Sequence, residues 1–158
     1  MIQRIQSLYL LLAAIISIVV LFLTIGTIYT DEFMYTYNCF TVKEACPNGG
    51  NILATYYIAA ALICSALLSI ITIFIYKKRD KQRTLNSVNM IIYLIALILM
   101  LYVYPNVVLI KKEIMASPDD LHFNYWIMLS LVPAILLYLS NRAIRKDEEL
   151  IRSTERLR

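Results

Sequence analysis

The chain has 158 residues, of which 60% are hydrophobic and only 16% are charged, and its formal net charge is +4. The charged residues gather in a few clusters that are separated by long neutral runs. This pattern is typical of an integral membrane protein and excludes an ordinary soluble domain. Basic residues in the loops beside the membrane account for the small net positive charge, so we expect no nucleic-acid partner.

Four runs contain no Asp, Glu, Lys, Arg or His, and they cover residues 7–29, 52–76, 88–110 and 123–140. About 20 helical residues cross a hydrocarbon layer of roughly 30 Å, and the shortest run is just long enough. Runs of this length without alternation favour helices, because a helix satisfies its own backbone hydrogen bonds in lipid. We therefore expect an all-α membrane protein, a four-transmembrane-helix bundle that forms one domain over residues 1–158.

The basic residues predict the orientation of these helices. Lys and Arg are retained on the cytoplasmic side of a membrane, and twelve of the 15 lie before the first run, between the second and third, or after the fourth. We therefore expect both termini in the cytoplasm. These twelve residues are Arg4, Lys77, Lys78, Arg79, Lys81, Arg83, Arg142, Arg145, Lys146, Arg152, Arg156 and Arg158.

The first outer loop, between the first two runs, contains two of the three cysteines. Residues 33–42 are rich in aromatic and β-branched side chains, so a short strand or β-hairpin is expected there. In an oxidising compartment, Cys39 and Cys46 are candidates for a disulfide, with the turn at residues 47–50 folding the loop back. Their C-x6-C spacing differs from the C-x-x-C pair of thiol oxidoreductases. Cys64, inside the second run, is expected to be a small buried packing residue.

Catalytic, cofactor-binding and metal-binding motifs are not found in the sequence. His122 is the only histidine and borders the fourth run, and Asp119 and Asp120 precede it in a turn-like segment. No P-loop, H-E-x-x-H or G-x-S-x-G motif occurs, so we expect no enzyme activity, no cofactor and no metal.

Transport by a charged relay is also not indicated, because the four runs hold no ionisable acid, base or histidine. Pro105 and Pro133 could break helices around a binding site, although kinks with a packing role are the commoner explanation. Asn86, Ser87 and Asn89, at the start of the third run, are expected to cap that helix.

The C-terminal segment after Ser140 contains no Gly or Pro, so the fourth helix is expected to continue as a cytoplasmic helical tail over residues 141–158. Its apolar residues fall on one side of a helix at 3.6 residues per turn, which makes the tail amphipathic. These residues are Ala143, Ile144, Leu150, Ile151 and Leu157. Two interpretations remain open: an anchor at anionic headgroups, or a docking surface for a partner.

Both ends of the chain carry distinctive polar residues: the start M-I-Q-R-I-Q, residues 1–6, and the segment N-R-A-I-R-K-D-E, residues 141–148. Together they resemble a Bacteroidota membrane family catalogued as domain of unknown function 4293, and the resemblance spans the whole chain. It implies a multi-pass protein of a bacterial inner membrane, with no established activity. The candidate residues for docking to a partner or to headgroups are Gln3, Arg4, Gln6, Asn141, Arg142, Arg145, Lys146, Asp147, Arg152 and Arg156.

These observations favour an accessory or scaffolding subunit of a larger inner-membrane complex, concerned with envelope biogenesis or protein export. Its expected partners are the lipid bilayer and other membrane proteins, and the sequence leaves its oligomeric state open. The alternative is a small transporter or lipid-binding protein with a neutral cavity between kinked helices. A polar cavity at mid-membrane depth would favour that alternative, and tightly packed helices would favour the subunit.

Overall fold

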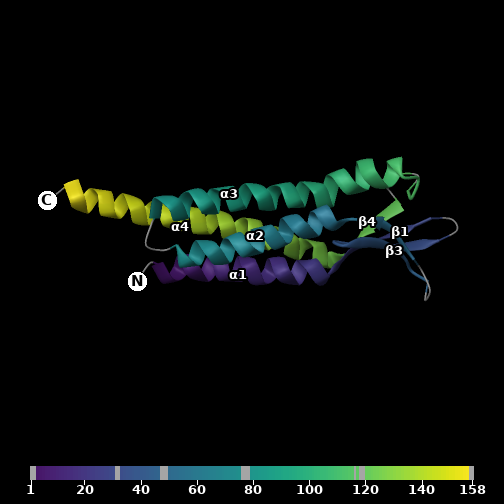
Figure 1. The fold of residues 1–158 in the computed structure, drawn as a ribbon, viewed down its shortest axis with the longest axis horizontal. Helices are drawn as coiled ribbons and strands as arrows, with labels where there is room; N and C mark the ends of the chain where they lie inside the picture. The colour runs from purple at the N-terminus through teal and green to yellow at the C-terminus, as the bar shows by residue number, and fades with distance from the viewer. Residues whose placement is uncertain are drawn as a thin grey trace.

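Four long helices and a five-stranded antiparallel sheet are present in the computed structural model (Figure 1). The structure describes residues 3–30, 33–46, 50–75, 79–115, 117 and 120–156, with side chains except at 3–4, 79–80 and 148–156. The helices lie side by side, and the sheet lies at one end of them, which we name the sheet end (Figure 1). The start of the first helix and the end of the last lie at the opposite end, the terminal end.

The helices pack in a closed ring of neighbours, because α1 and α3 each contact both α2 and α4. Helix α3 runs on into a π-helix, η1, and α4 is preceded by a 3-10 helix, η3. The bounds are α1 Gln3–Phe22, α2 Tyr56–Phe74, α3 Arg79–Ile98, η1 Leu99–Leu109, η3 Tyr125–Ser130 and α4 Leu131–Arg156.

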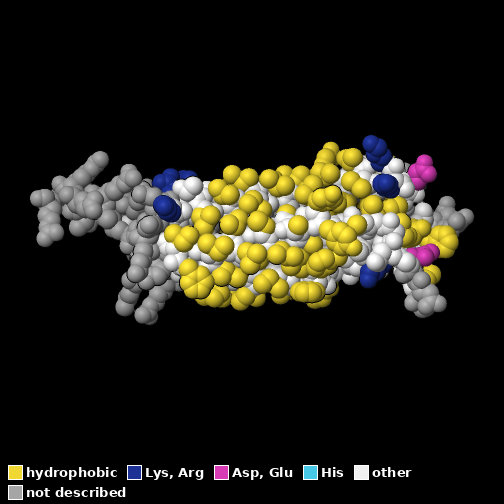
Figure 2. Space-filling model, viewed as in Figure 1, with side chains coloured by type: hydrophobic (Ala, Val, Ile, Leu, Met, Phe, Trp, Pro, Cys, Tyr) yellow, Lys and Arg dark blue, Asp and Glu magenta, His cyan; other side chains and the backbone are white. Residues whose placement is uncertain are grey.

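Within the described residues, four helices are long and apolar enough to cross a membrane. Figure 2 shows apolar side chains covering the middle of the molecule, with Lys and Arg at the terminal end and both signs of charge at the sheet end. A continuous apolar surface bounded by charge at two ends is the pattern expected of a protein that spans a bilayer.

The expectation of an all-α fold is wrong, because five strands form a sheet at one end of the helices. The strands are β1 Thr24–Tyr29, β2 Met34–Asn38, β3 Thr41–Glu44, β4 Asn51–Ala54 and β5 Leu121–Phe123. The hairpin expected in the first loop is present as β2 and β3. β1 and β4 occupy ends of apolar runs that were predicted to be helical, and β5 ends at Phe123, the first residue of the fourth run. Apolar, β-branched segments of this kind suit either structure, and here their backbone groups pair with other strands instead of within a helix.

The sheet joins parts of the chain that are distant in sequence. Its strand order is β4-β3-β2-β1-β5, so β1, which directly follows α1, lies between β2 and the late strand β5. Ile28 pairs with Leu121 of β5 and with Tyr35 of β2. Ile28, Tyr37 and Val42 are completely buried, which shows that one face of the sheet packs on the molecule's core.

Gly26 allows the close approach of β1 and β5. A Cβ atom at this position would lie 2.8 Å from the backbone oxygen of His122, closer than a carbon and an oxygen can approach without moving a strand. The neighbouring strand therefore leaves no room for a side chain at position 26, and only glycine fits. Gly26 also lies beside a bulge in the pairing of β1 with β2.

A hydrogen bond from the sheet satisfies a carbonyl in η1. In a π-helix each N–H donates to the carbonyl five residues earlier, and Pro105, five residues after Met100, has no N–H. The hydroxyl of Tyr37 in β2 donates to the Met100 carbonyl oxygen instead, at 3.1 Å. Burial, followed by the nearby Cys39, raises the pKa of Tyr37 far above its ordinary value, so the hydroxyl keeps its proton and remains a donor.

A second tyrosine bonds the start of the helix that contains the other proline. Pro133 lies in the first turn of α4, where a missing N–H costs least. The hydroxyl of Tyr93, which is completely buried, donates to the Ser130 carbonyl oxygen at 2.6 Å and so links α3 to the start of α4. Both roles considered for the prolines stay predictions.

Replacing Tyr37 by Phe tests the first of these bonds. The change removes only the hydroxyl and leaves a buried carbonyl without a donor, so we expect the free energy of unfolding to fall by about 1–3 kcal/mol. The measurement is unfolding of the purified protein in detergent micelles. Tyr102→Phe is the matched control, because Tyr102 lies in the same π-helix and is 64% exposed. Equal stability of the two variants would contradict the role given to the Tyr37 hydroxyl.

Candidate docking surface and the polar layer beside it

Three of the predicted docking residues face the interior at the terminal end. Gln6 on α1 and Asp147 on α4 are 4% and 8% exposed, and the Gln6 amide nitrogen donates a hydrogen bond to the Asp147 carboxylate. Asn141 is also buried, and its amide nitrogen donates to the Ser87 hydroxyl of α3 at 3.3 Å. The beginning and the end of the chain are therefore held together by their own polar side chains.

The predicted basic residues with described side chains point outward from α4. Arg142, Arg145 and Lys146 are all exposed, and we name these three residues the basic face. The side chains of Gln3, Arg4, Arg152 and Arg156 lie outside the described set. Figure 1 shows α4 continuing past the ends of the other helices, so the basic face lies near the start of a projecting helical segment.

The apolar stripe predicted on the tail begins inside the molecule. Ile144 is only 2% exposed and Ala143 is half-buried, so these two residues pack against the chain's own helices. The side chains of Leu150, Ile151 and Leu157 lie outside the described set. Any docking surface in the described part of the tail is consequently the basic face and not the stripe.

A layer of neutral polar side chains lies between α2, α3 and α4 beside this end. We name it the polar layer, and its members are Ser65, Ser69, Asn86, Asn89, Ser140 and Asn141, all buried. The Asn89 amide nitrogen donates to the Ser69 hydroxyl at 2.7 Å, which links α3 to α2. The Asn86 amide nitrogen donates to the Leu137 carbonyl oxygen at 3.2 Å, which links α3 to α4.

The expectation that Asn86, Ser87 and Asn89 cap the third helix is wrong, because α3 begins at Arg79. Asn86 and Asn89 lie two to three turns inside the helix and bond neighbouring helices. The sequence carries a signal for this role, since positions 86 and 89 are three apart, and 65, 69 and 72 on α2 are four and three apart. Residues at these spacings share one face of a helix.

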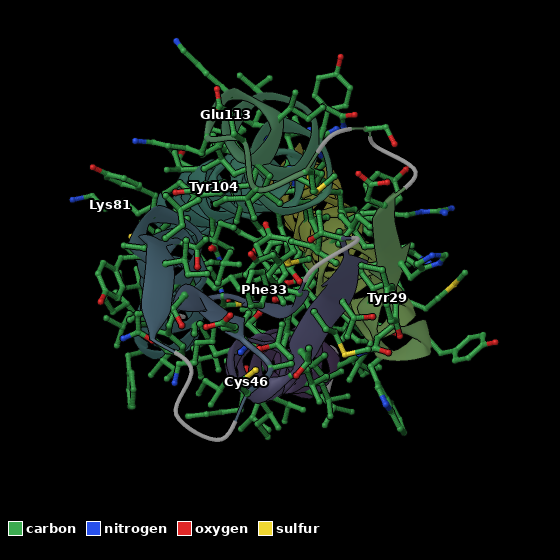
Figure 3. All side chains as sticks on the ribbon, turned by 90° about the vertical axis from the view of Figure 1, so that its right-hand side faces the viewer. Tyr29, Phe33, Cys46, Lys81, Tyr104 and Glu113 are labelled. Atoms are coloured by element: carbon green, nitrogen blue, oxygen red, sulfur yellow. The ribbon has the colours of Figure 1, made fainter. Side chains whose placement is uncertain are left out.

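The predicted disulfide between Cys39 and Cys46 is not present, because both cysteines are free thiols. Cys39 follows β2, Cys46 follows β3, and the four extended residues Thr41–Glu44 lie between them. Four strand residues span roughly 13 Å, whereas bonded cysteines need Cα atoms within about 7 Å. Figure 3, which looks onto the sheet end, shows Cys46 near the lower edge of the molecule.

Cys39 has a structural role instead. It is completely buried, and its thiol donates a long hydrogen bond of 3.6 Å to the Val20 carbonyl oxygen near the end of α1. Burial raises the pKa of this thiol to about 12, so it stays protonated and unreactive at neutral pH. Cys64, predicted to be a buried packing residue, is exposed on the outer surface of α2.

The residues considered for catalysis have ordinary structural contacts. The ring of His122 in β5 packs edge-on against Tyr29 of β1, with 5.3 Å between ring centroids. The carboxylate of Asp120 accepts hydrogen bonds from the Ser117 backbone nitrogen and hydroxyl, at 2.9 and 3.1 Å. Among the described side chains, no three His, Cys, Asp or Glu residues gather in a group that could hold a metal ion.

Two pockets are relevant to the alternative function, a transporter or lipid-binding protein. An apolar pocket of about 10 Å³ lies where the sheet meets the helices, beside Ile25, Met100 and Ser130, and has room for about one water molecule. A wide-open hollow of about 300 Å³ lies on the surface of α3, lined by Lys81, Thr84, Leu85 and Val88. Neither pocket is an enclosed, polar cavity of the size that a transported solute would need.

Comparison with known proteins supplies a family but no activity. A family profile described as "Domain of unknown function (DUF4293)" matches residues 2–157. No curated protein matches the chain.

Thiol labelling distinguishes the free cysteines from the disulfide. Without any reductant, we expect a water-soluble maleimide to label Cys46 in the native protein and Cys39 only after unfolding, in a Cys64→Ala background. Raising the pH from 7 to 9 should not expose Cys39, because its pKa of about 12 keeps the thiol protonated over this range. Mass spectrometry of the labelled peptides gives the result. Protection of both cysteines until a reductant is added would show that they are bonded.

Proposed function

This chain belongs to the family described as Domain of unknown function (DUF4293), and from that premise we propose that it is an accessory or scaffolding subunit of a larger inner-membrane complex. Its partner docks on the basic face of α4, through Arg142, Arg145 and Lys146. The protein has no catalytic role of its own in this proposal. A multi-pass protein with four membrane-crossing helices suits such a role because it can hold a partner at a fixed place on the bilayer.

The observation that carries the proposal is the division of the distinctive terminal residues into two groups. Gln6, Asn141 and Asp147 are buried and bond the chain's own helices, so internal packing accounts for them. Arg142, Arg145 and Lys146 are exposed on the same turns of α4, and no other described side chain forms a hydrogen bond or ion pair with them. Arginine offers a planar fork of donors that suits bidentate binding to a carboxylate, which favours a protein partner.

The same proposal sets the orientation: the terminal end is cytoplasmic and the sheet end is periplasmic. Support comes from the distribution of charge, because Lys and Arg dominate the terminal end while Glu44, Glu113 and Asp120 accompany the lysines of the sheet end. The family resemblance supports a bacterial inner membrane as the location.

The alternative is a small transporter or lipid-binding protein, and one observation favours it: the polar layer contains buried oxygens without hydrogen-bond partners among the described residues. Neutral polar groups between helices can line a solute path. The small volume of the apolar pocket beside Ile25 weighs against this alternative, and the subunit is therefore the better-supported proposal.

Reporter fusions test the orientation. We expect a cytoplasmic signal for fusions after Arg83 and after the last residue, and a periplasmic signal for fusions after Gly50 and Ser117, because basic loops are retained in the cytoplasm. A periplasmic signal from the C-terminal fusion would contradict both the orientation and the docking proposal.

Exchange of arginine for lysine tests the docking function. We expect Arg142→Lys with Arg145→Lys to lower the yield of a co-purifying partner at least tenfold from mild-detergent extracts, with the variant still inserted at normal abundance. The physical reason is that lysine keeps the charge but loses the planar fork of donors. The yield is measured by quantitative mass spectrometry and normalised to inserted protein.

Lys111→Arg with Lys112→Arg is the matched control, because it exchanges two exposed basic residues at the sheet end without changing the charge. The control should keep every partner. Substitutions of Ile144 are unsuitable, because that side chain is buried among the helices. If the Arg→Lys variant retains every partner that the wild type recovers, docking through the guanidinium groups fails. Anchoring at anionic headgroups would then explain the basic face, since attraction of about 1 kcal/mol per residue depends on charge alone.

A further inference from the structure

Two serines in the polar layer lack the partner that serines in helices ordinarily have. A serine or threonine inside a helix commonly bonds the carbonyl four residues earlier. Ser17, Ser69 and Thr72 follow this pattern, at 2.7, 3.0 and 2.6 Å. The hydroxyls of Ser65 and Ser140, 1% and 0% exposed, have no hydrogen-bond partner within the described part of the chain. Ser65 and Ser140 therefore differ from the other three residues, and a partner outside the chain would satisfy their hydroxyls.

Three asparagine side chains in the same layer use their nitrogen but not their oxygen. The amide nitrogens of Asn86, Asn89 and Asn141 each donate to an atom of a neighbouring helix. Their amide oxygens have no partner within the described part of the chain. An amide oxygen is only an acceptor, so each of these three positions needs a group that brings a hydrogen-bond donor.

The number of these atoms makes their accidental burial improbable on energetic grounds. One buried oxygen without a donor lowers the folding equilibrium constant by roughly tenfold, and five would lower it by roughly 10⁵-fold. That loss is comparable with the whole folding constant of many small proteins. The five oxygens come from α2, α3 and α4, so a shared set of bound molecules between these helices would meet the need of all of them.

We propose that the polar layer binds ordered water molecules that bridge α2, α3 and α4. Water supplies two donors for the amide oxygens and both a donor and acceptors for the serine hydroxyls, which no single ion does. The members of the layer are all neutral, so a metal cation would lose its hydration shell without gaining a counter-charge. Bridging of this kind needs only single water molecules, each bonded to two or more of these side chains.

The inference goes beyond the docking function and does not depend on it. It also bears on the alternative function, because bridging waters satisfy the polar layer without a transported solute. Bound water explains why a membrane-crossing region carries five oxygens that the other described residues leave without partners.

Removal of the serine hydroxyls tests the proposal through the sign of the stability change. With bound water, Ser65→Ala and Ser140→Ala should each lower the folding equilibrium constant roughly fivefold, the effect of one lost hydrogen bond. Without a bound partner, alanine removes an unsatisfied polar atom and the constant should rise. Ser17→Ala is the matched control, because that hydroxyl is equally buried and its hydrogen bond to the Ala13 carbonyl is lost in the same way, so a fall of similar size is expected. A rise or no change in Ser65→Ala and Ser140→Ala, while the control falls, overturns the proposal.

Magnetisation transfer from water detects the bound molecules directly. We expect solid-state NMR of the ¹⁵N-asparagine-labelled protein in lipid to show transfer from water to the side-chain NH₂ groups of Asn86 and Asn89, assigned by single Asn→Leu variants. The absence of transfer to both groups overturns the proposal.

Replacement of sodium and potassium by choline separates water from a cation. The thermal midpoint of the wild type should be unchanged, because water remains available at every salt composition. A midpoint that falls on removal of the cation, in the wild type but not in Ser140→Ala, would identify a cation as the occupant and overturn the assignment to water.

Discussion

Inside a bilayer no bulk water reaches a carbonyl that a proline has left without a helical donor, and this chain meets that constraint at Pro105 with a tyrosine hydroxyl. Tyr37 donates to Met100, five residues before Pro105. This bond has a wide effect because Tyr37 belongs to the sheet. It fixes β2 on the helix at the place where α3 changes to a π-helix, and β2 holds β1 and, through it, β5. The sheet is thereby packed on the helices and is not an appended loop.

Some polar side chains of α4 face into the molecule and others face outward. Positions 141, 144 and 147 recur at every third residue and face inward, where Asn141 and Asp147 bond α3 and α1. The arginines and the lysine between them face outward. The polar segment at the end of this chain therefore combines two different physical requirements, closure of the helices and exposure of basic groups. Only the exposed residues remain available to another molecule.

The four membrane-crossing helices could be predicted from the sequence because long uncharged runs have few other solutions. Strands β1 and β4 could not, because residues 24–29 and 52–54 continue such runs without a break. The second partner of β1, β5, lies more than 90 residues later, and no local pattern reveals that pairing. Among the site residues, the exposed arginines could be predicted from amphipathicity. The burial of Gln6 and Asp147 depends on the contact of α1 with α4, which a single helix cannot show.

The length of α4 determines which forces act on its far end. Nine helical residues follow Asp147, and at 1.5 Å per residue they extend the helix by about 14 Å. The electrostatic field of a charged bilayer surface decays over about 8 Å at physiological ionic strength. With the bilayer surface at the level of Asp147, the last turn of α4 lies beyond this distance. Attraction to headgroups then acts on residues near Asp147 far more strongly than on the tip of the helix, where only direct contacts with other molecules matter.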